Sequence, residues 1–250
     1  MIGPGADEDV AGAGGAEGRD AAGEKRVFFS GDDRLEGMLG WPEGDAVAGG
    51  VVVAHPHPPS GATMAVPTVF RMAKSCRAQG LASLRFNFRG VGESLGTFSG
   101  TEEDRDVAAA AEFLRGRLAA LDGDAVPGPS TRPVALSGYS FGSIMAARAA
   151  AALGYVQALV LVGFVVEWDQ LPADTFERLG AFRGPVLALC AENDDMGRPE
   201  DVERAIRGLG LDYTLDVVEG AGHFLEGRHR EVGERVAAFL AERLVAETWR

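Results

Sequence analysis

The strongest candidate for chemistry is Ser140, which stands between two glycines in the pentapeptide G-Y-S-F-G at positions 138–142. A buried strand is predicted just before it, at residues 133–136, and an alanine-rich helix opens after it, at residues 144–147. A serine on so sharp a strand-to-helix turn is strained and exposed, and the glycines let strand and helix pass closely. The helix start also directs free backbone N–H groups toward any anion that forms beside the serine. We therefore predict that Ser140 is a nucleophile.

The same G-x-S-x-G spacing occurs a second time, around Ser94 at positions 92–96. Chance matches to so short a motif are expected in a chain with 35 glycines among 250 residues, so the context must decide. A turn-rich run at residues 96–100 follows Ser94, and no helix start is predicted there. We therefore interpret Ser94 as a loop serine.

An activated serine needs a base, and the base needs a carboxylate that fixes its orientation. Among the four histidines, His223 lies in a glycine-flanked turn after a predicted strand. His229 falls at the start of the last predicted helix, where a solvated helix-terminal role explains it. The acid is predicted in the turn after another strand, where Asp194 and Asp195 both remain open and Glu192 is interpreted as part of a solvated acidic turn. We predict that His223 is the base.

An oxyanion that develops beside the serine needs two N–H donors. The backbone N–H of Phe141 is one candidate, because this residue follows the serine directly. The second donor is expected from the loop after the strand at residues 51–54, whose prolines have no N–H. The donors left in that loop belong to His57, Ser60 and Gly61. We select His57 by its position.

A metal site is the alternative interpretation of this loop, because His55 and His57 form an H-x-H pair. A catalytic metal usually has three protein ligands, and no matching cluster of cysteine and histidine accompanies the pair. We therefore predict neither a metal nor a cofactor.

The elements that position these residues alternate along the chain. Strands are predicted at residues 49–54, 81–88, 133–136, 158–162, 186–190 and 213–218, and an N-terminal hairpin is predicted from residues 26–29 and 35–41. Segments with helical apolar spacing lie between the later strands, the second of them preceded by a predicted capping box at residues 101–104. This alternation predicts a parallel sheet covered by helices on both faces, with its chemistry at the carboxyl ends of the strands.

Composition limits the class of protein. A net charge of −13 argues against binding to nucleic acid or to an anionic membrane, and no apolar run reaches spanning length. Cys76 and Cys190 lie in apolar runs and are predicted to be free buried thiols, which fits the cytoplasm. Residues 1–24 are acidic and rich in glycine and alanine, without the pattern of a signal peptide. We predict a disordered tail at residues 1–24 and one domain at residues 25–250.

Four motifs in order along the chain resemble the α/β-hydrolase superfamily. They are H-P-H-P at residues 55–58, R-F-N-F-R-G-V-G-E-S at residues 85–94, G-Y-S-F-G at residues 138–142 and G-A-G-H at residues 220–223. Within it, the chain resembles small lid-less bacterial serine hydrolases related to the dienelactone hydrolases and to Xaa-Pro-dipeptidyl-peptidase-like domains. This resemblance implies an α/β-hydrolase fold, with a mostly parallel doubly wound sheet, an N-terminal antiparallel hairpin and a minimal lid.

The resemblance also assigns roles to site residues. It implies Ser140 as nucleophile and His223 as base. It favours Asp194 as the acid, because the family's G-x-x-D turn falls on residues 191–194, although alanine replaces the first glycine and keeps Asp195 open. The residues after H-P-H-P also depart from the family pattern, which leaves the shape of the oxyanion loop open.

We predict from these residues a serine hydrolase that cleaves small carboxylic esters through an acyl-enzyme. Thioesterase, lactonase and acyltransferase activities on the same Ser-His-Asp triad remain alternatives. So does a non-catalytic binding protein, although such a protein needs no intact triad. The expected partner is a small-molecule ester, and the chain could form a homodimer. Residues 163–184 are too short and polar for a broad apolar lid, so we expect a preference for short acyl groups.

Overall fold

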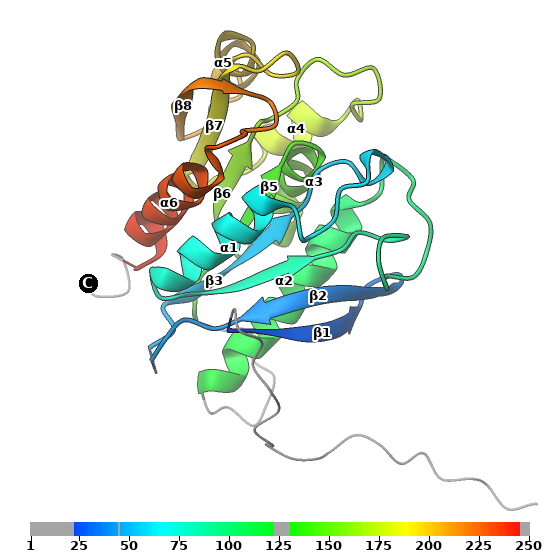
Figure 1. The fold of residues 1–250 in the computed structure, drawn as a ribbon, viewed down its shortest axis with the longest axis vertical. Helices are drawn as coiled ribbons and strands as arrows, with labels where there is room; N and C mark the ends of the chain where they lie inside the picture. The colour runs from blue at the N-terminus through cyan, green and yellow to red at the C-terminus, as the bar shows by residue number, and fades with distance from the viewer. Residues whose placement is uncertain (1–22, 45, 123–130, 246–250) are drawn as a thin grey trace, which may run out of the picture.

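The structure is a computed structural model that describes residues 23–44, 46–122 and 131–245 (Figure 1). The predicted tail lies outside the described residues, apart from its last two positions. Most of the glycine- and proline-rich loop before the nucleophile strand, residues 123–130, also lies outside them.

A single eight-stranded sheet forms the centre of the domain, with strand order β1-β2-β4-β3-β5-β6-β7-β8. Its strands are β1 (Glu24–Ser30), β2 (Arg34–Gly40), β3 (Gly49–Ala54), β4 (Leu81–Phe86), β5 (Val134–Tyr139), β6 (Val156–Val162), β7 (Val186–Asn193) and β8 (Tyr213–Gly222). β2 pairs antiparallel with β1 and β4, and every other pairing is parallel. The predicted mostly parallel sheet with an N-terminal hairpin is confirmed.

Helices cover both faces of this sheet. They are α1 (Pro67–Ala78), α2 (Asp104–Ala119), α3 (Phe141–Ala150), α4 (Thr175–Gly180), α5 (Pro199–Arg207) and α6 (His229–Leu240), with short helical turns at Pro58–Ser60, Ala120–Asp122, Ala151–Leu153 and Ala241–Val245. α1 and α6 lie side by side and share one apolar core with the sheet, whereas α2 to α5 contribute to a second core (Figure 1). Such two-sided burial explains why the central strands are almost wholly apolar. None of the described helices is long and apolar enough to cross a membrane.

The first strand begins at Glu24, one residue before the predicted start of the domain. The Glu24 side chain is buried, and its carboxylate accepts hydrogen bonds from Arg77 at 2.8 Å and from Arg85 at 2.6 Å. A buried carboxylate needs such partners, which lie far away in the sequence. The ion cluster therefore extends the domain to Glu24, the last residue of the predicted tail.

β4 ends at Phe86, two residues before its predicted end. The N–H of Asn87 still donates to the Glu36 carbonyl, opposite it in the register of β2 and β4, but the N–H of Phe88 leaves the ladder and donates to the side chain of His55 at Nε2. Apolar side chains continue past this point, so sequence periodicity does not show where the ladder stops.

The predicted capping box at residues 101–104 is wrong. α2 begins at Asp104, and the hydroxyl of Ser99 instead accepts hydrogen bonds from the N–H groups of Thr101 and Glu102. Glu103 is fully buried, and its carboxylate accepts hydrogen bonds from the N–H and hydroxyl of Ser99. The hydrogen bonds before α2 therefore involve Ser99 and Glu103 instead of Thr101 and Asp104. A buried carboxylate needs hydrogen-bond donors, and Ser99 provides them for Glu103.

Candidate active site

Ser140 lies on the turn between β5 and α3, at a backbone φ of 54°. A positive φ is strained for a residue with a side chain, and such strain is concentrated at functional sites. A Cβ at Gly138 would collide with the backbone of Gly142, and one at Gly142 would collide with the carbonyl of Ala54. The two glycines therefore allow the close approach that the sequence predicts.

A continuous chain of hydrogen bonds joins Ser140, His223 and Asp194. The Ser140 hydroxyl lies 2.9 Å from His223 Nε2, and His223 Nδ1 lies 2.8 Å from the nearer carboxylate oxygen of Asp194. The carboxylate can only accept, so Nδ1 carries the proton, and Nε2 is left to accept from the hydroxyl. Asp194 is fully buried, and it also accepts hydrogen bonds from the N–H groups of Met196 and Gly197. This arrangement can remove a proton from Ser140.

The structure brings Asp194, and not Asp195, to His223. Asn193 ends β7 and pairs with Gly222 at the end of β8, so the next residues of both strands emerge side by side. Asp194 turns inward toward His223, whereas Asp195 is exposed. Glu192 accepts a hydrogen bond from the N–H of Gly220, 2.7 Å away, and so ties the two strand ends together.

Tyr139 holds the His223 loop, a role that sequence reasoning missed. Its hydroxyl donates a 2.7 Å hydrogen bond to the backbone carbonyl of His223. Burial, assisted by the negative charges of Asp194 and Glu226, raises the pKa of Tyr139 above its ordinary value, so the phenol stays protonated. The hint in the sequence was the position of this aromatic residue directly before the serine.

Phe141 and His57 line the same cavity as Ser140, and the backbone N–H of each makes no hydrogen bond within the described part of the chain. Phe141 is the first residue of α3, where an N–H has no partner within the helix. In the loop after β3, the N–H of Ser60 donates to the carbonyl of His57, and the N–H of Gly61 donates to the carbonyl of Pro58. Across the part of the chain that the structure describes, His57 is the one of the three predicted donors whose N–H makes no hydrogen bond.

His55 has a structural role in the loop after β3. Its Nδ1–H donates to the Pro56 carbonyl at 2.7 Å, and its Nε2 accepts from the N–H of Phe88 at 3.2 Å. The ring is fully buried, and desolvation lowers the pKa of His55 to about 4. Since both ring nitrogens are occupied by backbone groups, His55 is not available to bind a metal together with His57.

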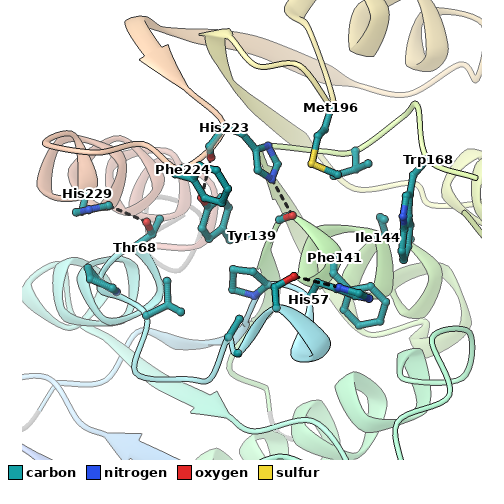
Figure 2. Close-up of a pocket in the computed structure, with 18 residues that line it drawn as sticks. His57, Thr68, Tyr139, Phe141, Ile144, Trp168, Met196, His223, Phe224 and His229 are labelled. Carbon is teal, nitrogen blue, oxygen red and sulfur yellow. Dashed lines mark hydrogen bonds between the residues drawn. The ribbon is translucent and has the colours of Figure 1, made fainter. Parts of the chain in front are cut away.

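A cavity of about 410 Å³ opens beside Ser140. Trp168 and Ile144 line one side of it, and Thr68, Phe224 and His229 line the other (Figure 2). His229 does begin α6 as predicted, but its interpretation as a merely solvated residue is wrong. Its ring lines the cavity and bonds to Thr68, 161 positions away, a contact that only the packing of α1 against α6 creates.

Comparisons with known proteins show the family and the fold. The alpha/beta hydrolase domain family matches residues 48–246. An alpha-beta serine hydrolase homologue from Coxiella burnetii is 28% identical, with a TM-score of 0.73 over 86% of this chain and 97% of that one. A serine hydrolase without a lid from Xanthomonas campestris is 26% identical, with a TM-score of 0.70 over 88% and 95%. An uncharacterized protein of Rickettsia prowazekii is 25% identical over 224 residues, which cover 86% of this chain and 88% of the relative.

Proposed function

This chain belongs to the α/β-hydrolase domain family, and from that premise we propose that it cleaves small carboxylic esters as a serine hydrolase. The family and its solved serine hydrolase homologues support a hydrolase. The observation that carries the proposal is the hydrogen-bonded chain from Asp194 through His223 to Ser140. A serine, a base and a buried carboxylate in this geometry are what acyl transfer requires.

The first half of the proposed reaction forms an acyl-enzyme. Ser140 Oγ attacks the ester carbonyl carbon while its proton passes to His223 Nε2. Asp194 keeps His223 in the correct tautomer and stabilises the imidazolium that results. The backbone N–H groups of Phe141 and His57 donate to the oxyanion. His223 then gives its proton to the alcohol oxygen, and the bond between that oxygen and the carbonyl carbon breaks.

The second half releases the acid. Water takes the place of the alcohol, gives a proton to His223 Nε2 and attacks the acyl carbon. The oxyanion is held by the same two N–H groups. Collapse returns the proton to Ser140 and frees the carboxylic acid.

The short segment between β6 and β7 favours short acyl groups. α4 has six residues and is the helix that the described chain forms between β6 and β7. Each CH₂ of an acyl chain contributes about 0.8 kcal/mol to binding when apolar side chains bury it. A long acyl chain therefore gains little binding energy where few apolar side chains are available to cover it. We expect kcat/KM to peak at acetyl or butyryl esters and to fall at octanoyl and palmitoyl esters of the same alcohol. A steady rise through palmitoyl would contradict the short-acyl preference.

A fluorophosphonate probe tests the function itself. It should label the wild type and fail to label Ser140→Ala, with the label mapped to the peptide that contains Ser140. A parallel panel of esters, thioesters and lactones with equal acyl groups should give the highest kcat/KM for the esters. A protein that stays unlabelled and hydrolyses none of them would be a binding protein, which would overturn the proposal. A thioester or lactone as the best substrate would replace the ester.

A further inference from the structure

The cavity beside Ser140 has two chemically different sides (Figure 2). Trp168 and Ile144 give one side an apolar wall. On the other side, Thr68 and His229 bring a hydroxyl and an imidazole to the wall. An apolar pocket with a few placed polar groups is the usual form of a site that orients a ligand.

The polar side is built from two helices that lie far apart in the sequence. Thr68 is the second residue of α1 and is fully buried, and His229 is the first residue of α6 and is partly buried. Thr68 Oγ1 and His229 Nδ1 are 2.9 Å apart. The other ring nitrogen of His229 has no hydrogen-bond partner within the described chain. The pair thus retains hydrogen-bonding capacity on two residues that line the cavity.

Phe224 stands at the mouth of the cavity on this side. Its side chain is 70% exposed, although the next residue, Leu225, is buried. Leu225 has a φ of 56°, a left-handed conformation that is costly for leucine and that turns its side chain into the core. The Phe224 ring also contacts the ring of His223, with the centroids 5.7 Å apart. The loop therefore holds an exposed aromatic ring beside the group that would protonate the leaving alcohol.

We propose that Thr68, His229 and Phe224 form a subsite for the alcohol half of the substrate, and that this alcohol carries a second hydroxyl. The inference rests on the proposed ester hydrolysis. The hydroxyl bonds to the Thr68–His229 pair, Phe224 covers the alkyl part, and the acyl group lies toward Trp168. The substrate class is then a short-chain monoester of a diol or polyol, which water converts into a carboxylic acid and the free diol or polyol.

A matched pair of esters tests the subsite. 3-Hydroxypropyl butyrate and butyl butyrate differ by a terminal hydroxyl in place of a methyl group. The wild type should prefer the hydroxyl ester by about three- to tenfold in kcat/KM, the range expected of one neutral hydrogen bond. This preference should disappear in Thr68→Val and in His229→Phe, and it should remain in Thr68→Ser.

Thr175→Val is the matched control. Thr175 is also a fully buried threonine at the start of a helix, but its hydroxyl donates to the Pro172 carbonyl away from the cavity. This variant should keep the preference. Suppose instead that Thr68 and His229 only hold α1 against α6. Their variants would then be less stable and would hydrolyse both esters more slowly by the same factor, so the ratio of the two kcat/KM values would not change. That result would overturn the subsite.

A second pair locates the hydroxyl. Butyl 4-hydroxybutyrate and butyl pentanoate carry the same exchange in the acyl half, where no preference is expected. A preference there, and not in the first pair, would overturn the assignment to the alcohol half. Fluorophosphonate labelling separates the two proposals: an unchanged ratio with labelled Ser140 removes the subsite and leaves the esterase. A wild type that is neither labelled nor active removes both.

Discussion

The chain contains two G-x-S-x-G motifs, and the structure gives their serines opposite environments. Ser140 stands on a strand-to-helix turn with its hydroxyl bonded to His223. Ser94 is buried in the loop after β4, where its hydroxyl donates to the Asn87 carbonyl at 2.7 Å and accepts from the Glu36 N–H at 2.9 Å. A serine whose hydroxyl is held by two backbone groups has no free proton for a base.

The glycines of the two motifs are needed for different reasons. Gly92 and Gly96 have positive φ values of 58° and 87° and shape a loop. Gly138 and Gly142 are required because strand and helix pass too closely for a Cβ. The same motif therefore forms a loop around Ser94 and the strand-to-helix turn that carries the nucleophile at Ser140. The following helix is what distinguishes them.

Replacement of each serine should give the largest contrast. Ser140→Ala removes the nucleophile and should lower kcat by about 10⁴ or more. Ser94→Ala should leave kcat within about tenfold but lower the free energy of unfolding by about 1–3 kcal/mol, because two buried backbone groups lose their partner. Ester hydrolysis and urea unfolding measure the two effects. An inactive Ser94→Ala beside an active Ser140→Ala would reverse the assignment.

The two adjacent aspartates offer the next contrast. Asp194→Asn should lower kcat by about 10⁴, because His223 loses control of its tautomer. Asp195→Asn should change kcat by less than about threefold, since an exposed charge contributes little. Steady-state kinetics at pH 8 on both folded variants would measure this. Equal small losses would mean that another carboxylate serves His223.

His223 serves Ser140, whereas His55, which accepts a hydrogen bond from Phe88 in the loop that carries Ser94, should act on stability. The folded chain keeps His55 neutral down to about pH 4, whereas the unfolded chain protonates it below its ordinary pKa of 6.5. The unfolded state thus binds more protons in this window, so the stabilisation is complete above pH 6.5 and is lost as the pH falls toward 4. The fall in pKa corresponds to roughly 3 kcal/mol.

His55→Gln isolates this contribution, because glutamine can donate and accept hydrogen bonds without titrating. Urea unfolding at pH 7 and pH 4.5 should show a smaller loss of stability in acid for the variant than for the wild type. An identical loss in both proteins would show that His55 is not protonated on unfolding.

The residues that precede the two serines should give the smallest contrast. Tyr139→Phe removes the hydrogen bond to the His223 carbonyl and should lower kcat about three- to tenfold, with KM nearly unchanged. Glu93→Gln, before Ser94, removes a surface ion pair with Arg26 and should change kcat by less than about twofold. A Tyr139→Phe loss that falls on KM alone would argue against a positioning role.

Strong local patterns account for the parts of the molecule that the sequence predicted. Apolar strands and amphipathic helices are periodic, so the sheet and its two helical layers followed from them. Ser140 and His223 could be singled out because few serines have a strand and a helix around them and the chain has four histidines. The choice between Asp194 and Asp195 depends on the register of β7 with β8, which cannot be read from two neighbouring residues in the sequence.

The features that were missed depend on contacts between distant segments. The bond of Tyr139 to His223 and that of Thr68 to His229 span 84 and 161 positions. The early end of β4 and the displaced cap of α2 likewise follow from buried polar groups that find partners elsewhere. Local propensity carries no information about such partners.

Detection of the acyl-enzyme tests the central claim most directly. The wild type would be mixed with a butyryl ester, quenched in acid during the first turnovers and digested for mass spectrometry. We predict a butyryl group on the peptide that contains Ser140, and none on any peptide of Ser140→Ala. Steady turnover without an adduct, or an adduct on Ser94, would contradict the account.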